Sequence, residues 1–322
     1  MISVIIGALL PVVVTLALGM LAGWHRDYDV EAARSLNHMV LVYALPLALF
    51  AGTINIPRAE LIGDWPLLIV LLAATVMPFL LALLVDLYIV RPTLRAAALQ
   101  AMAFGFPAIA FTGIPILTPL IGSKATVVVD FAGLTGNIII LPTTLVLLSF
   151  ARVRGDGSGS GDDWHSTGDG ITTALKGSLL QPVVLSPLLS IALVLLNVRM
   201  PGVVSSSFSL LGSTVGGISL FASGVILQSQ SLTVSLPAAV SSVARLLVIP
   251  GLTFAVLMQL GVSGDELKMA VLALGLAAAP MQVILSTRYR TDEQENASVL
   301  LYTNVLCIPT LAFFIWLTQS SP

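Results

Sequence analysis

Two apolar stretches contain the residues best placed to bind a ligand. The first, FGFPAIAFTGIPIL, covers residues 104–117 and contains Pro107 and Pro115, while the second, LGLAAAPMQVILS, covers residues 274–286 and contains Pro280. A proline in a helix interior removes a backbone donor and costs roughly 3 kcal/mol, so we expect both stretches to interrupt a helix. The N-terminal ends of half-helices present unpaired N–H groups and a positive dipole, which suit a carboxylate.

Polar side chains near the two stretches are further candidates for ligand contact. Thr112 lies between the first two prolines, and Gln282 follows Pro280 by two residues. Asn137 and Asn304 lie in the middle of apolar segments, where an asparagine either joins helices by a hydrogen bond worth about 1 kcal/mol or contacts a substrate or ion. The candidate binding residues are therefore Pro107, Ala108, Thr112, Gly113, Pro115, Asn137, Ala279, Pro280, Met281, Gln282 and Asn304.

Two charged residues could act within the membrane. Asp130 could carry a proton or bind sodium, although its place near Lys124 favours an ordinary boundary aspartate. Arg245 lies about ten residues into an apolar segment, and we expect its stem to let the guanidinium reach the inner interface; otherwise it is a counter-charge for an anion. The three histidines are not spaced with other ligands, so we expect no metal site and no cofactor.

Composition shows what kind of elements must position these residues. The chain has 322 residues, 57% of them apolar and only 9% charged, with a mean hydropathy of +1.02, whereas soluble chains carry about 25% charged residues. We therefore expect an all-α, multi-pass integral protein of the inner cell membrane, in contact with lipid and without a nucleic-acid partner. Windows of about 20 apolar residues predict ten spans: 3–23, 36–55, 65–90, 93–122, 124–150, 175–197, 204–228, 236–260, 266–287 and 296–318.

Basic residues orient these spans. The loops after odd-numbered spans hold nine Lys and Arg residues, and the opposite loops hold four, Arg58, Lys124, Arg199 and Lys268. Because the more basic side faces the cytoplasm, we expect both termini outside. The polar segment between spans five and six reads as a flexible cytoplasmic linker over 152–173, separating a first five-helix unit, 1–151, from a second, 174–322.

The two halves resemble each other in order along the chain. Five pairs recur at offsets of 167 to 173 residues: Pro11 and Pro182, Phe50 and Phe221, Pro78 and Pro250, Pro107 and Pro280, and Asn137 and Asn304. Since each half has five spans, the second copy must enter from the opposite face, which predicts a 5+5 inverted repeat. Broken helices at corresponding positions point to a binding site, so we expect spans four and nine to cross near the midplane instead of merely kinking.

Several motifs resemble the auxin efflux carrier family of permeases, which includes bacterial malonate transporters and plant PIN carriers. They are YALPLALFAG, FPAIAFTGIPIL, RLLVIPG, AAAPMQVILSTRYRTDEQENAS and LYTNVLCIPT, and the resemblance covers nearly the whole chain. It implies a fold shared with bile-acid symporters, a scaffold domain of spans 1, 2, 6 and 7, a transport domain of spans 3–5 and 8–10, an elevator-type movement and a homodimer. The family often has asparagine after the span-four proline, where this chain has Ala108.

These observations predict a secondary transporter of a small organic anion, such as malonate or an auxin-like acid, with the substrate held at the paired breaks. A sodium-dependent carrier of the bile-acid-symporter type is an alternative, for which Asn137, Asn304, Gln282 and Ser286 supply polar groups but no midplane glutamate. An intramembrane enzyme would need a Ser/His pair, two aspartates or a metal motif at membrane depth, and none is present in the sequence. Coupling by Na⁺ or H⁺ stays open.

Overall fold

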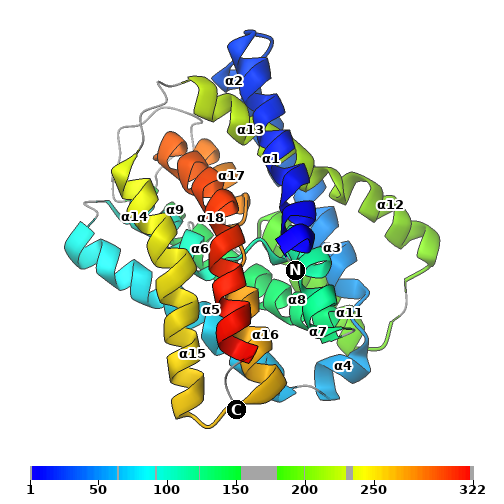
Figure 1. Ribbon diagram of the computed structural model, residues 1–322. Helices are drawn as coiled ribbons and strands as arrows, with labels where there is room; N and C mark the ends of the chain where they lie inside the picture. The colour runs from blue at the N-terminus through cyan, green and yellow to red at the C-terminus, as the bar shows by residue number, and fades with distance from the viewer. Residues whose placement is uncertain are drawn as a thin grey trace.

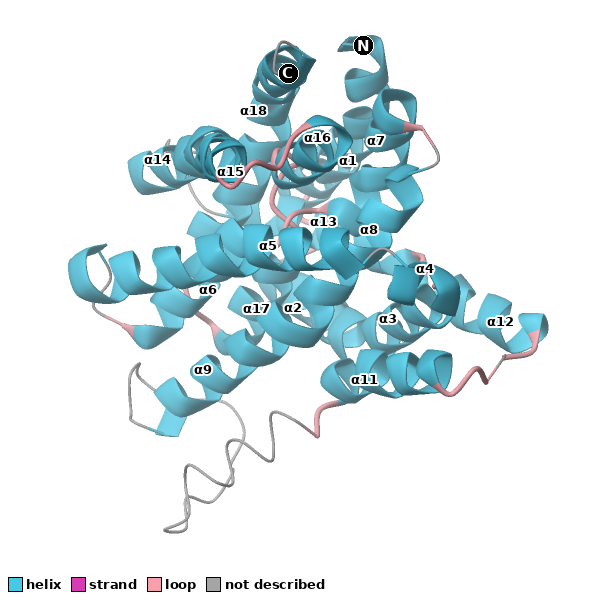
Figure 2. Ribbon diagram, turned by 90° about the horizontal axis from the view of Figure 1, so that it is seen from below, coloured by secondary structure: helices cyan, strands magenta, loops and turns pink. Residues whose placement is uncertain are grey.

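The computed structural model describes residues 2–63, 65–90, 93–122, 124–153, 180–198, 200–229 and 235–319, and within them the named elements are all helices. Figure 2 shows these helices gathered into one bundle, with α12 projecting at its edge beside α3. Six segments in this described part are long and apolar enough to cross a membrane: Val30–Ile54, Trp65–Ile89, Val127–Ala151, Gly202–Ser229, Leu236–Gln259 and Glu293–Gln319. An integral membrane protein is the expected consequence.

The helices follow the expected spans closely in the first half of the chain. They are α1 (Ile2–Trp24), α2 (Val30–Met39), η1 (Val40–Ala44), α3 (Leu45–Ile54), α4 (Arg58–Gly63), α5 (Trp65–Val85), η2 (Asp86–Val90), α6 (Leu94–Gly105), η3 (Ile109–Gly113), α7 (Ile114–Ile121), α8 (Lys124–Thr135), η4 (Gly136–Ile140) and α9 (Leu141–Val153).

The second half continues after a stretch that lies outside the described residues and contains nearly all of the predicted linker. Its helices are α11 (Pro182–Leu195), α12 (Gly202–Gly212), α13 (Thr214–Ser229), α14 (Leu236–Val243), η5 (Ala244–Val248), α15 (Ile249–Gln259), α16 (Gly264–Leu274), α17 (Met281–Tyr289) and α18 (Glu293–Gln319). Two expected spans, 93–122 and 266–287, are divided into α6 and α7 and into α16 and α17, so neither is one continuous helix.

Five turns of π-helix share one sequence feature that the span predictions did not use. Each ends two residues before a proline: η1 before Pro46, η2 before Pro92, η3 before Pro115, η4 before Pro142 and η5 before Pro250. A proline cannot donate to the carbonyl one turn earlier and its ring crowds that carbonyl. A wider turn relieves the crowding, and such turns often occur at functional sites. Thr112, Asn137 and Arg245 all lie within these turns.

Close helix contacts fix the frame around the two interrupted segments. Helix α1 lies along α13, and α18 lies between α1 and α14 (Figure 1). At the first of these contacts, a Cβ added to Gly19 would lie 2.0 Å from the Phe221 carbonyl oxygen, and one added to Gly224 would lie 2.1 Å from that of Leu16. Only glycine permits backbones to approach so closely, which is how small residues pack helices in membranes.

Candidate functional site

The two interrupted segments touch each other through their backbones. Pro107 and Ala278 form an isolated antiparallel bridge. The Ala108 N–H donates to the Ala277 carbonyl at 2.8 Å, and the Ala279 N–H donates to the Phe106 carbonyl at 3.2 Å. The prolines at 107 and 280 thus lie beside the contact that joins the two breaks, and each break supplies partners for groups that the other leaves unpaired.

Side chains from other helices satisfy the rest of the second break. The Thr303 hydroxyl accepts from the Ala278 N–H at 3.2 Å, and the Cys307 thiol donates to the Gly275 carbonyl at 3.4 Å. Arg245 donates from Nη1 to the Leu274 carbonyl at 3.0 Å and from Nη2 to the Ala277 carbonyl at 3.5 Å. Buried backbone groups need such partners, because an orphaned one costs as much as a lost hydrogen bond.

The position of Arg245 corrects a prediction. We expected its side chain to reach the inner interface, but the residue is 0% exposed and lies against the end of α16. The π-turn η5 places the guanidinium inside the bundle, and the terminal carbonyls of the half-helix supply a better environment than hydrocarbon would. The snorkelling expectation is therefore wrong, and Arg245 belongs to the surroundings of the break.

The first break relies on its own segment and on an apolar contact. The Thr112 hydroxyl donates to the Ala108 carbonyl at 3.0 Å, and the Thr112 N–H donates to the same oxygen at 3.0 Å. The Phe106 ring packs against Gly136, where an added Cβ would lie 1.9 Å from Cε2 of the ring. After Phe106 the chain returns to helical turns in η3 and α7 within three residues.

A small cavity lies at the contact between the breaks. It is lined by Val12, Ala108, Thr112, Leu220, Ala278, Pro280, Leu300 and Asn304, and its volume of about 10 Å³ is near the room that one water needs. The Asn304 side chain is 2% exposed and donates from Nδ2 to the Leu300 carbonyl at 2.8 Å, while its Oδ1 has no partner. One residue of the cavity wall, Asn304, therefore has an unused acceptor.

Four of the predicted site residues, Ala108, Thr112, Pro280 and Asn304, line this cavity. Pro107, Ala279, Gly113 and Met281 lie in or directly beside the two breaks and are buried. Gln282 is also buried, and it donates from Nε2 to the Asn296 carbonyl at 3.2 Å while its Oε1 has no partner.

Among the described side chains, those of Asn137 and Asp130 do not line the cavity. Asn137 is half-buried in η4, and Asp130 is half-buried in α8. Pro115 lies in the first turn of α7, and its side chain is outside the described part of the structure. Four further residues surround the site and were not predicted, because the sequence criteria selected polar residues near prolines. They are Val12, Leu220, Thr303 and Cys307. Thr303 adjoins Asn304, and that adjacency was the available clue.

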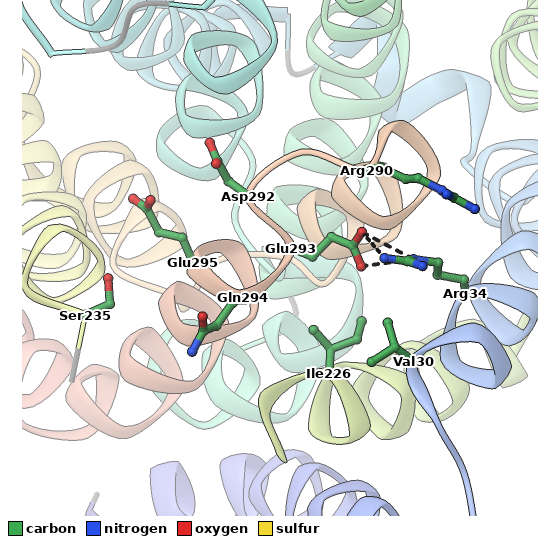
Figure 3. A pocket seen from close by; sticks show the side chains of 9 residues that line it. All are labelled: Val30, Arg34, Ile226, Ser235, Arg290, Asp292, Glu293, Gln294 and Glu295. Atoms are coloured by element: carbon green, nitrogen blue, oxygen red, sulfur yellow. Dashed lines mark hydrogen bonds and ion pairs between the residues drawn. The ribbon is translucent and has the colours of Figure 1, made fainter. Parts of the chain in front are cut away.

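A larger cavity, of about 530 Å³, opens near the start of α18 (Figure 3). Its lining combines Arg34 from α2, Ile226 from α13 and the charged turn from Arg290 to Glu295. Arg34 and Glu293 face each other in Figure 3, with Nη2 2.8 Å from Oε1. Arg34 also pairs with Glu31. An Arg–carboxylate pair of this kind joins residues 259 positions apart and fixes α2 to the start of α18.

The chain is similar to known proteins along nearly its whole length. A family model described as "Membrane transport protein" matches residues 4–315. The relatives include the uncharacterized transporter YfdV of Escherichia coli strain K12, with 28% identity over 321 residues that cover 99% of both chains. They also include a putative malonate transporter of Rhizobium meliloti, with 24% identity over 320 residues that cover 98% of this chain and 96% of the relative.

Proposed function

The chain belongs to the membrane transport protein family, and from this premise we propose that it is a secondary transporter of a small organic anion, held where the two broken helices meet. Membership in a family of transporters speaks for transport and against an intramembrane enzyme. The similarity to a putative malonate transporter supports a carboxylate as cargo. We place the protein in the inner cell membrane, with both termini outside.

One observation carries the proposal: a small cavity lies where the two helix breaks meet, and one of its lining residues, Asn304, has an oxygen without a partner. At the start of α17 the N–H groups of Val283 and Ile284 donate to the Pro280 carbonyl, so the N–H groups of Met281 and Gln282 are the ones at the open end of this half-helix. These donors and the positive helix ends suit a carboxylate at the cavity, and Thr112 offers a hydroxyl between them.

The composition of the cavity wall supports alternating access by an elevator-type movement. Val12 and Leu220 come from α1 and α13, which fall in the predicted scaffold, whereas Ala108, Pro280 and Asn304 come from the predicted transport domain. A cavity of about 10 Å³ is too small for a carboxylic acid, because cargo pockets are many times larger. Sliding the second group of helices past the first would enlarge the site toward one side of the membrane.

We assign the larger cavity to the access route from the side of Arg34 and Glu293. Helices α13 and α18 line both cavities. Helix α13 contributes Ile226 to the larger cavity and Leu220 to the smaller one, and α18 contributes Glu295 and Leu300 in the same way. Leu300 follows Glu295 by five residues in α18, so the two cavities are separated by about 8 Å along the axis of this helix. A cluster of buried apolar side chains that includes Leu220, Val283 and Leu300 fills part of this interval and would act as the barrier.

A second candidate, a sodium-coupled carrier, draws support from the unpaired acceptors. Nδ2 of Asn304 and Nε2 of Gln282 are committed to backbone carbonyls, so it is the oxygen of each amide that lacks a partner. Amide oxygens are suitable ligands for a hard cation, and Asn304 Oδ1 would equally accept a hydrogen bond from a protonated acid. Na⁺ and H⁺ are therefore the coupling ions to compare.

Uptake into proteoliposomes tests both candidates. The purified protein is offered radiolabelled acetate, malonate and succinate, with and without an inward Na⁺ gradient or an inward proton gradient. Saturable uptake of at least one acid above protein-free liposomes is expected. Stimulation by Na⁺ alone would favour the second candidate, and an absence of uptake under every condition would refute carboxylate transport.

The two equivalent asparagines provide a matched pair for locating the cargo. Asn304→Ala removes the amide whose Oδ1 would accept from a protonated acid or bind a co-transported cation, and is expected to raise KM about tenfold, the loss typical of one such interaction. Asn137→Ala removes the same amide from the equivalent position, which does not line the cavity, and should leave KM within about twofold. Equal effects from both variants would contradict this placement.

A further inference from the structure

Arg245 is a buried cation whose surroundings lack an ion pair. The residue is 0% exposed, and among the described residues no carboxylate lies within ion-pair distance of its guanidinium. Two of its nitrogens donate to carbonyls at the second break, and Nε has no partner. A buried charge is costly unless it is paired, and an ionisable group at membrane depth calls for a partner.

The guanidinium lies one shared oxygen away from the cavity wall. The Ala277 carbonyl accepts from Arg245 Nη2 at 3.5 Å and also from the N–H of Ala108 at 2.8 Å, and Ala108 lines the cavity. The charge of Arg245 interacts strongly with a charge in the cavity, because protein and not water fills the space between them. Arg245 is thus a positive charge close to the site without being part of its lining.

We propose that Arg245 is the positioning residue that makes the site select anions: it holds the carbonyls of the second break and its charge is balanced by the bound cargo. The inference rests on the proposed function and adds the origin of its charge preference. The carbonyl contacts orient the guanidinium and hold its positive charge at the negative, C-terminal end of the α16 half-helix. An anion in the cavity then faces the N–H ends of the other half-helices and, behind Ala277, the fixed cation.

A charge-matched series of cargo probes and variants separates this role from a merely structural one. In proteoliposomes at a pH where malonate carries two charges, we would measure KM for malonate and for acetate, and the inhibition constant of neutral malonamide. Wild type is compared with R245Q and R245K, and with R58Q, which removes an equal charge from an exposed position on α4.

The expected result is a change in selectivity. R245Q should raise KM for malonate by about 10- to 100-fold, raise KM for acetate less, and leave inhibition by malonamide within about threefold. R245K keeps the charge and should keep the malonate-to-malonamide ratio within about threefold of wild type, even where total uptake falls. R58Q should match wild type in every measurement.

Four outcomes would count against the inference, and one of them concerns the proposed function as well. Equal weakening of all three probes in R245Q would mean that Arg245 only supports the fold. If R245Q does not insert, loss of the malonate preference in a folded R245K would overturn the role of charge. Wild-type protein that takes up neither acid would refute the proposed function, whereas wild-type uptake with an unchanged ratio in R245Q would refute this inference alone.

Discussion

The two helix breaks reach one contact by different means. The first break, around Phe106–Ala108, is followed at once by helical turns. Thr112 of the same segment donates a hydrogen bond to the Ala108 carbonyl, and the Phe106 ring packs against Gly136. The second runs without regular helix from Gly275 to Pro280. Its backbone groups bind side chains that arrive from η5 and α18, namely Arg245, Thr303 and Cys307.

The difference between the two breaks can be followed at positions that the predicted repeat pairs. At the offset of 167 residues that relates Asn137 to Asn304, Thr303 corresponds to Gly136 and Cys307 to Ile140. A hydroxyl supports the backbone in the second half where a missing side chain admits the Phe106 ring in the first. The two breaks thus share an interruption of the backbone and differ in the chemistry that stabilises it, so substitutions at positions that the predicted repeat pairs should fail for different reasons.

The largest expected effect comes from filling the space at Gly136. In Gly136→Ala the new Cβ would overlap the Phe106 ring, and overpacking of this kind costs about 1–3 kcal/mol. The Tm of the detergent-solubilised protein should fall by about 4 °C or more. Gly133→Ala is the matched control one turn earlier, where an added Cβ meets nothing within 4 Å, and its Tm should stay near wild type.

A second substitution tests whether the ring is the cause. Phe106→Leu removes the ring atoms that the new Cβ would meet, so in the Phe106→Leu background Gly136→Ala should cost much less than in wild type. An equal loss of Tm in both backgrounds would show that the glycine is needed for something other than the ring.

The breaks themselves could be predicted from the sequence, because proline acts locally on the backbone and its effect can be read from neighbouring residues. The same reasoning found Ala108, Thr112, Pro280 and Asn304, all of which line the cavity. It did not separate Asn304 from Asn137, since periodicity gives the depth of a residue in a span and not the direction that its side chain faces.

The π-turns and the position of Arg245 could not be predicted from the sequence. Each π-turn ends two residues before a proline, but the crowding at a proline can produce a kink, a break or a wide turn, and the sequence does not say which. Arg245 was given a snorkelling side chain because hydropathy treats the lipid as its surroundings, whereas its partners are carbonyls 29 and 32 residues away in the chain.

An intermediate effect is expected at the second break from Thr303→Val. Valine keeps the shape of threonine but leaves the Ala278 N–H without its partner, and a buried orphan donor costs about 1–3 kcal/mol. Thr144→Val is the matched control, because that buried hydroxyl donates to the Ile140 carbonyl one turn earlier and, among the described residues, supports no break. The Tm of Thr303→Val should fall by about 2–4 °C relative to the control. Identical Tm values would mean that the hydroxyl does not support the break.

The smallest effect is expected where the ends of the two segments meet water. Asp265 Oδ2, at the start of α16, is 2.8 Å from Lys124 Nζ at the start of α8, and both side chains are more than half exposed.

The hydrogen bond from Lys124 is the main reason that the pKa of Asp265 is lowered. A carboxylate with a lowered pKa adds stability above its unfolded-state pKa and loses it as the pH falls through the folded-state value. Asp265→Asn should therefore lower Tm at pH 7 by no more than about 2 °C, and the curves of variant and wild type should converge only as the pH falls below the ordinary pKa of an aspartate, about 3.9. Glu266→Gln removes an equal charge from the next residue and controls for the effect of net charge. A difference in Tm between wild type and Asp265→Asn that persists unchanged after the pH has fallen far enough to protonate both carboxylates would show that the ion pair is not its source.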